Sequence, residues 1–268
     1  MKNLFKHIIL IFSSILLFGS CSVVPLTGRK QLNLLPESEM VSMGLTNYSA
    51  FLKDNSLSSD KGKAALVYKV GSDISMAVIK FFTDNGLQSR LDGYQWEFNL
   101  VKNDSTANAW CMPGGKVVVY SGILPYTIDQ NGLAVVLSHE IAHAVARHGN
   151  ERMSQQLIVE MGGIALSEAI SQKPEETKSI FNTAYGVGTQ VGIMLPFSRK
   201  HELEADKLGL IFMAMAGYDP MTAIAFWERM ASAGGKKPAE FLSTHPSDAT
   251  RINKIKEAMP EALKYYKK

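Results

Sequence analysis

The chain is poor in cysteine and in excess charge of either sign, and these scarcities exclude several classes of protein. Two cysteines in 268 residues exclude a small fold held together by many disulfides. The formal net charge is only +3, and no basic stripe interleaved with aromatic residues occurs, so we expect no nucleic acid partner. Internal repeats and low-complexity tracts are also lacking. The length therefore predicts one sizeable domain with a substantial core.

Long apolar runs are scarce too, and the most evident one lies at the N-terminus. Lys2 and Lys6 precede an apolar run over residues 8–18, which is short for a bilayer span and is followed by Gly-Ser-Cys. This order is typical of a secretory signal, and the cysteine resembles that of a bacterial lipobox, although Phe18 stands where leucine is usual. We predict a lipoprotein signal peptide over residues 1–20, with Cys21 lipidated as the mature N-terminus. A plain cleaved signal and an uncleaved anchor are the alternatives.

Lipidation at Cys21 has consequences for location and for the remaining cysteine. It predicts a lipid-anchored protein of the bacterial cell envelope, at the outer membrane facing the periplasm, which contacts the membrane through its N-terminal lipid. Cys111 then has no partner for an intramolecular disulfide, so we expect it to be a buried, small, apolar residue.

The mature chain divides into a short tether or surface strap, residues 22–36, and a single domain, residues 37–268. Apolar periodicity and turn residues predict helices over 37–53, 62–84, 132–148, 150–171, 177–195, 199–216, 220–232 and 247–267, the last with a break at Pro260. Strands are predicted over 94–101 and on both sides of the turn at 113–115, between 108 and 122. The expected fold class is α+β, mostly α, with one small antiparallel sheet before the helix 132–148.

A glycine-rich stretch, residues 161–195, has two open interpretations. Gly188 and Gly192 are four apart, a spacing that lets helices pack closely within a bundle. A mobile lid or a membrane-contacting hairpin is the alternative.

The most specific motif is HEIAH, residues 139–143, within a helix that we expect to end at a Gly149 cap. His139 and His143 are four apart and share one helical face, so both can bind one metal ion. Glu140 can reach a metal-bound water without binding the metal itself, which is the arrangement of zinc metallopeptidases. An ordinary surface pair of histidines fits poorly, because the flanking sequence is apolar and buried imidazoles need partners.

A catalytic zinc site needs a third protein ligand and one open position. A histidine six residues after His143 would supply it in one class of enzymes, but a glycine stands there and His148 is one residue short. The segment FSRKHELEADKLG offers carboxylates instead. Glu202 and Asp206 share a helical face, with Glu204 on the opposite side. We predict Glu202 as a ligand and Asp206 as the acceptor for a ligand histidine's second N–H, the alternative being a solvated charged face.

HEIAH, SRKHELEAD and THPSDATRI together resemble peptidase family M48, which includes the HtpX, Oma-type and CAAX-prenyl endopeptidases. The likeness runs from PLTGRKQL to the C-terminal helix and is greatest to the Oma-like branch. It implies a gluzincin-type metallopeptidase domain with one Zn²⁺ per chain on His139, His143 and Glu202, and with Glu140 as the general base. The family's NAFAxPGG segment reads NAWCMPGG here, which affects the expected shape of the pocket but not the metal site.

Peptide hydrolysis also needs a donor for the oxyanion, and His245 and Arg251 in THPSDATRI are the candidates. The alternative is that His245 is a structural residue before a helix and that Arg251 is a charge on the surface. A histidine near zinc could instead fill the open position and keep the enzyme latent. We expect a substrate to pair with the edge of the small sheet near Asn108 and Ala109, because an extended peptide gains main-chain hydrogen bonds there.

Recognition through the main chain tolerates many sequences but requires an unfolded segment. The resulting expectation is an endopeptidase for unfolded or misfolded cell-envelope proteins, with envelope-assembly machinery as a further partner. The alternative is a zinc-stabilised periplasmic chaperone or assembly module that binds such chains without cleaving them.

Overall fold

The computed structural model describes residues 21–161, 177, 198–232, 240–245 and 249–267. The predicted signal peptide lies outside these residues. So does the glycine-rich stretch apart from its first residue, Met161, and Thr177, and neither Gly188 nor Gly192 is described. The lipidation of Cys21 therefore stays a prediction.

Most of the described chain is helical, as expected. The longer helices are α2 (Glu37–Asp54), α3 (Lys61–Asp84), α5 (Gln130–Val145), α6 (His148–Met161), α9 (Arg199–Met215), α10 (Thr222–Ser232) and α12 (Ala249–Ala262). Two short helices, α4 (Leu124–Thr127) and α11 (Glu240–Thr244), were not predicted. Each is shorter than the window over which helical periodicity can be recognised.

The central sheet contains β3 (Glu97–Val101), β4 (Ala109–Met112) and β5 (Lys116–Tyr120) in the order β3-β5-β4. The tight turn between β4 and β5 makes that pair antiparallel, with Gly114 and Gly115 at positive φ as a turn there requires. However, β3 pairs with β5 in parallel, so the expected purely antiparallel sheet is wrong. The chain between β3 and β4 crosses past β5, and periodicity along a strand carries no information about such a crossing.

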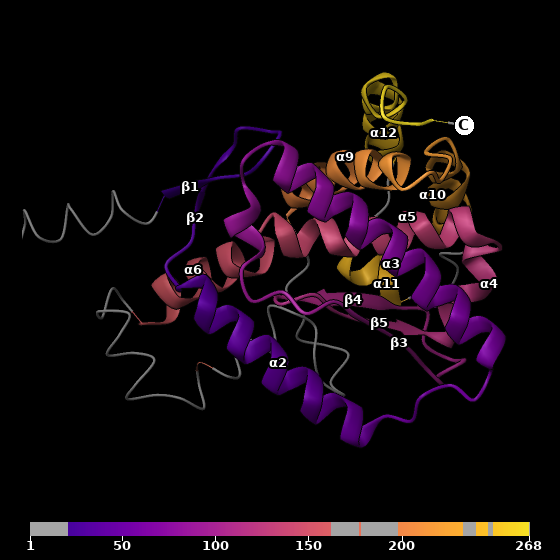
Figure 1. Ribbon diagram of the computed structural model, residues 1–268, viewed down its shortest axis with the longest axis horizontal. Coiled ribbons are helices and arrows are strands. Elements are labelled where there is room, and N and C mark those ends of the chain that lie inside the picture. The colour runs from indigo at the N-terminus through magenta and orange to yellow at the C-terminus, as the bar shows by residue number, and fades with distance from the viewer. Residues whose placement is uncertain (1–20, 162–176, 178–197, 233–239, 246–248, 268) are drawn as a thin grey trace, which may run out of the picture.

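Both faces of this sheet are covered, which explains why its strands are almost entirely buried (Figure 1). Alternate residues of β5 point to opposite faces: Val117 and Val119 join the main core with α3 and α5, and Val118 joins a second core with α2 and α6. Cys111 lies in the main core as a free thiol, and burial raises its pKa well above the ordinary value. The prediction of a buried cysteine is confirmed.

The segment predicted as a tether or strap is a strap. It forms a second sheet from β1 (Cys21–Val23) and β2 (Lys30–Leu32), which lies beside α6 in Figure 1. We call residues 21–36 the N-terminal strap. The Gln31 side chain donates to the carbonyl of Ala146 at 3.0 Å, and the Leu34 N–H donates to Ser154 Oγ at 2.8 Å. These contacts hold the strap against the junction of α5 and α6.

The helix that carries HEIAH begins at a well-defined cap and ends earlier than predicted. The Asp129 side chain accepts the N–H of Gly132, a standard N-cap contact. The helix stops at Val145, not at Gly149, because Arg147 adopts a left-handed φ of 61° that breaks the helical path. His148 therefore starts α6 in a new direction, and Gly149 lies inside that helix.

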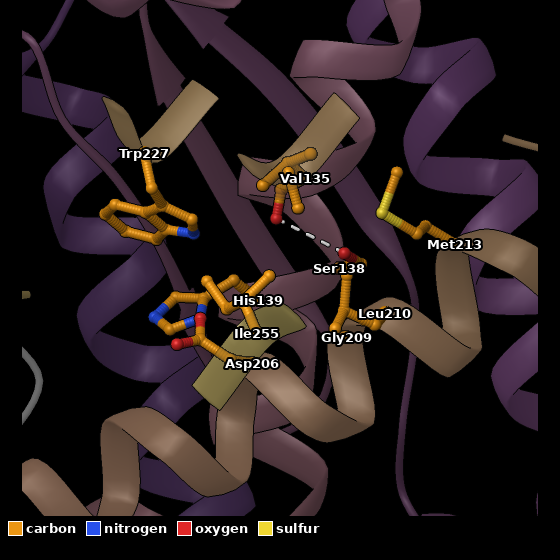
Figure 2. Close-up of a pocket in the computed structure, with 10 residues that line it drawn as sticks. Val135, Ser138, His139, Asp206, Gly209, Leu210, Met213, Trp227 and Ile255 are labelled. Carbon is orange, nitrogen blue, oxygen red and sulfur yellow. Dashed lines mark hydrogen bonds and ion pairs between the residues drawn. The ribbon is translucent and has the colours of Figure 1, made fainter. Parts of the chain in front are cut away.

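Close packing of α5 on α9 brings the two halves of the predicted site together. A Cβ placed on Gly209 would lie 3.1 Å from the backbone nitrogen of His139, so a larger residue there would have to push the two helices slightly apart. Gly209 and Ser138 lie next to each other in Figure 2. Within the described part of the chain, no helix is both long and apolar enough to cross a bilayer.

Candidate metal centre

The two histidines of HEIAH converge as their spacing predicts. Both rings project from α5, both are buried, and their Nε2 atoms lie 3.0 Å apart. Glu202 reaches them from the first turn of α9, where Ser198 is the N-cap. Its carboxylate oxygens lie 3.4 Å from His139 Nε2 and 3.3 Å from His143 Nε2.

These separations fit a tetrahedral zinc ion. With Zn–N and Zn–O bonds of about 2.0–2.1 Å, ligand atoms of a tetrahedron lie about 3.3–3.4 Å from one another. His139, His143 and Glu202 therefore form a donor set of the right type and spacing, and the prediction of these three ligands agrees with the geometry.

A fourth ligand atom completes the cluster. His245 Nδ1 lies 3.1 Å from His139 Nε2 and 3.0 Å from Glu202 Oε1. The ligand atoms of all four residues lie within 4.8 Å of one another, and all four residues are buried. His245 therefore lies beside the ligand set, where it would be able to supply a fourth donor to a bound zinc ion, and a structural role far from the site is wrong.

Glu140 borders the cluster without belonging to it. Its Oε1 lies 3.4 Å from His245 Nε2 and has no hydrogen-bond partner among the described residues. Burial raises the pKa of Glu140 to about 7. A buried carboxylate with an unpaired oxygen and a near-neutral pKa is suited to taking up and releasing a proton at a metal centre.

Asp206 lies beside the first ligand histidine, at the position expected of the acceptor for its second N–H. Its Oδ1 lies 3.0 Å from His139 Nδ1, on the side of the ring away from the ligand cluster. Figure 2 shows the His139 ring between the Asp206 carboxylate and the Trp227 indole. Because Nδ1–H is held by Asp206, Nε2 is the atom left to bind metal.

Arg251 is buried and fixes the carboxylates of the site, so its interpretation as a surface charge is wrong. Its Nε and Nη2 each lie 2.7 Å from an Asp206 oxygen, and its Nη1 lies 2.8 Å from Glu202 Oε2. The guanidinium also packs 3.5 Å from the centre of the Trp227 ring. Although burial opposes ionisation of Glu202, the nearby His245 and Arg251 hold its pKa well below the usual range. These contacts favour positioning of the ligands over donation to an oxyanion.

His148 and Glu204 were not predicted to belong to the site. His148 Nδ1 lies 2.9 Å from His143 Nδ1, and Glu204 Oε2 lies 3.0 Å from His148 Nε2. Burial lowers the pKa of His148 to about 4, so its ring is neutral near pH 7. Helical geometry places His148 away from His143, and only the break at Arg147 turns it back, so no sequence periodicity could have indicated it.

The two residues predicted to contact substrate lie at an edge of the sheet, because β4 is an outer strand. Asn108 and Ala109 are, however, only 3% and 2% exposed. The carbonyl of the preceding residue, Ala107, accepts the N–H of Phe241 in α11 at 3.0 Å. Contact with a peptide at this edge stays a prediction.

The sequence is similar to a known peptidase family and to several of its members. The family model described as Peptidase family M48 matches residues 76–259. The chain is 32% identical over 286 aligned positions to the mitochondrial metalloendopeptidase OMA1 of Saccharomyces cerevisiae, covering 99% of this chain and 80% of the relative. It is 41% identical over 176 positions to the OMA1 protein of Schizosaccharomyces pombe, covering 65% of this chain and 50% of the relative.

A bacterial relative is also similar. The β-barrel assembly-enhancing protease of Escherichia coli is 31% identical over 166 positions, covering 59% of this chain and 33% of the relative. The chain thus matches half of the fission yeast protein's length and one third of the bacterial protein's. The matched region contains both helices that carry the metal ligands, and the chain belongs to peptidase family M48, with a zinc metallopeptidase centre built on α5 and α9.

Proposed function

We propose that this protein is a zinc-dependent endopeptidase that cleaves unfolded or misfolded proteins of the bacterial cell envelope. The observation that carries the proposal is the position of Glu140, which is buried beside the three metal ligands with an oxygen that no hydrogen bond engages among the described residues. A purely structural zinc site needs no proton-accepting carboxylate beside its ligands.

The chain's own residues have distinct parts in the reaction. Zinc bound at this centre would acidify a water molecule and polarise the scissile carbonyl. Glu140 is placed to take a proton from the attacking water and to return it to the leaving amine nitrogen. Asp206 holds His139 in the tautomer that leaves Nε2 to bind metal, and Arg251 keeps Asp206 and Glu202 ionised and in place.

The sheet edge and the bacterial relative support the proposed substrate class. An extended segment that pairs with β4 near Asn108 and Ala109 would gain main-chain hydrogen bonds irrespective of its sequence, which favours unfolded chains. A lipid on Cys21 would keep the enzyme at the envelope membrane. The name of the bacterial relative, a β-barrel assembly-enhancing protease, supports an envelope role, and envelope-assembly machinery is a fitting partner.

The proposal predicts metal-dependent proteolysis of a loosely folded protein. We expect the purified chain to contain about one zinc per molecule and to degrade a casein-type substrate, because the described residues form one buried site of this geometry. A chelator should abolish the cleavage and added zinc should restore it. Elemental analysis measures the zinc content, and electrophoresis of the fragments measures the cleavage. Cleavage that persists after zinc has been removed would contradict the proposal.

Replacing His245 by alanine is expected to raise basal proteolysis. The Nδ1 atom of His245 lies among the ligand atoms, so removing the ring vacates the fourth position for water. If about ten resting molecules are closed for each open one, the rate should rise about tenfold. The initial rate of casein cleavage at equal zinc content is the measurement. A large loss of rate would instead assign His245 to oxyanion stabilisation.

A further inference from the structure

We propose that His148 is a positioning residue for the metal ligand His143, and that the N-terminal strap holds His148 in place through Arg29 and Glu204. The inference rests on the metal centre described above. It concerns how that centre is held rather than which substrate it cleaves.

The contact between His148 and His143 occurs at the ring nitrogen that faces away from the metal cluster. His143 Nε2 points to His139 and Glu202, whereas His143 Nδ1 lies 2.9 Å from His148 Nδ1. Both residues are buried, and His148 has no exposed surface. The two rings cross at 77°. The Nδ1–Nδ1 separation is that of a hydrogen bond between buried groups.

Metal binding leaves one consistent arrangement of protons. When His143 binds through Nε2, its Nδ1 carries the hydrogen and must donate, so His148 Nδ1 is the acceptor. Because its Nδ1 accepts, His148 carries its hydrogen on Nε2, which donates to Glu204 Oε2 at 3.0 Å. The chain of hydrogen bonds from His143 through His148 to Glu204 thus has a single direction.

The strap holds Glu204, the last residue in this series of hydrogen bonds. Glu204 accepts from Arg29 Nε at 2.7 Å and also from Thr27 Oγ1. The other two guanidinium nitrogens of Arg29 form a bidentate pair with Glu151 at 2.8 and 2.7 Å. A bidentate arginine fixes direction as well as distance, so Arg29 fixes the position of the strap relative to α6 and α9. Because the guanidinium binds both carboxylates, the cluster is not a second cation site.

The other ligand histidine has the same arrangement, an acceptor that is itself held by an arginine. His139 donates to Asp206, and Asp206 is fixed by Arg251. The two ligand histidines of α5 are therefore each backed by an acceptor, and each series of contacts ends at a buried or nearly buried arginine. The arginine comes from α12 in one case and from the strap in the other. Such outer contacts orient the ligand ring and raise its basicity, which strengthens metal binding.

The competing interpretation is a polar network that only fills the core. His201 provides a matched control for it, because its ring stacks on His148 with centroids 4.6 Å apart and lies 3.0 Å from the carboxylate of Glu151. It shares the burial and the network of His148, but none of its described contacts reaches His143. Phenylalanine at either position keeps a flat buried ring and removes the ring nitrogens.

The test is zinc affinity of the full chain, measured by competition with a chromophoric chelator. We expect His148→Phe to weaken zinc binding about 10–100-fold, the usual effect of losing such an outer contact. His148→Asn should recover most of the affinity, since its Oδ1 can accept from His143 in place of Nδ1. His201→Phe should bind zinc like the unchanged protein. The absorption spectrum of bound Co²⁺ should shift in His148→Phe only.

Two results would overturn the role of His148. One is unchanged affinity in His148→Phe, and the other is an equal loss in His148→Phe and His201→Phe, which only a general structural role explains. If His148→Phe does not fold, His148→Gln replaces it, because glutamine can reach Glu204 but offers His143 no acceptor at the Nδ1 position. Equal affinity of the Asn and Gln variants would then refute the inference.

Arg29→Gln tests the part played by the strap. We expect weaker zinc binding than in the unchanged protein and faster cleavage after Lys30 by added trypsin, a site that both proteins contain, because Glu204 and Glu151 lose their shared partner. Unchanged zinc affinity would show that the strap does not support the metal site. A protein that shows these zinc affinities but never degrades casein would refute the proposed function and leave this inference standing.

Discussion

Glu140→Gln is expected to abolish peptide hydrolysis while leaving zinc bound. Glutamine has the same shape as glutamate but cannot take a proton from water, and general acid–base groups of this kind contribute about 10²–10⁴-fold to the rate. Zinc content should not change, because His139, His143 and Glu202 supply the donor set and Glu140 does not belong to it. The measurement is the initial rate of casein cleavage at equal zinc content.

The matched control for this substitution is Glu257→Gln. Glu257 is an exposed carboxylate in the same chain that pairs with Lys254 on the surface of α12, and the rate should not change. Cleavage that survives in Glu140→Gln would make the mechanism wrong. Binding of unfolded chains with no cleavage, even by the unchanged protein, would favour the chaperone or assembly module over the enzyme.

Arg251→Leu is expected to destabilise the fold by about 3–5 kcal/mol, because it leaves two buried carboxylates without their partner. Arg251 is 3% exposed and contacts Asp206 and Glu202 at 2.7 and 2.8 Å. Leucine fills part of the space but compensates neither charge. The free energy of unfolding, from urea titration followed by circular dichroism, is the measurement. The loss should be larger in the metal-free protein, where no cation offsets the charge of Glu202.

Lys254→Leu is the control for loss of a cation from the same helix. Lys254 pairs with Glu257 in an exposed i,i+3 contact, and such pairs contribute at most about 1 kcal/mol. A destabilisation by Arg251→Leu no larger than that of Lys254→Leu would show that the buried ion pairs do not hold the site together.

The sequence predicted those parts of the site that depend on local geometry. His139 and His143 lie one helical turn apart, so the fold of α5 alone brings them onto one face. The same holds for Glu202 and Asp206 in α9. The ligand cluster and the contact of Asp206 with His139 agree with these predictions. Residue type and the turn at 113–115 likewise predicted β3, β4 and β5, although not the parallel pairing of β3 with β5.

The end of the zinc helix and the topology of the sheet were predicted wrongly from the sequence. The first depends on a single backbone angle, and the second on the path of a crossing connection. The expected end of the zinc helix at Gly149 is wrong, since Arg147 adopts a positive φ that sequence patterns rarely predict for a residue other than glycine. That same angle turns His148 towards His143. The sheet topology depends on the path between β3 and β4, where no periodicity applies.

By itself, then, the sequence determined which side chains could bind a metal, because helical repeat and residue type suffice for groups within one turn. Only the tertiary structure decided what surrounds them: His245 among the ligands, Arg251 on two carboxylates, and Arg29 behind His148. These partners come from segments far apart in the chain. The packing of α5 on α9 and of the strap on α6 brings them together and removes their charges from water. A buried charge is stable only beside a close partner, so these residues pair with one another.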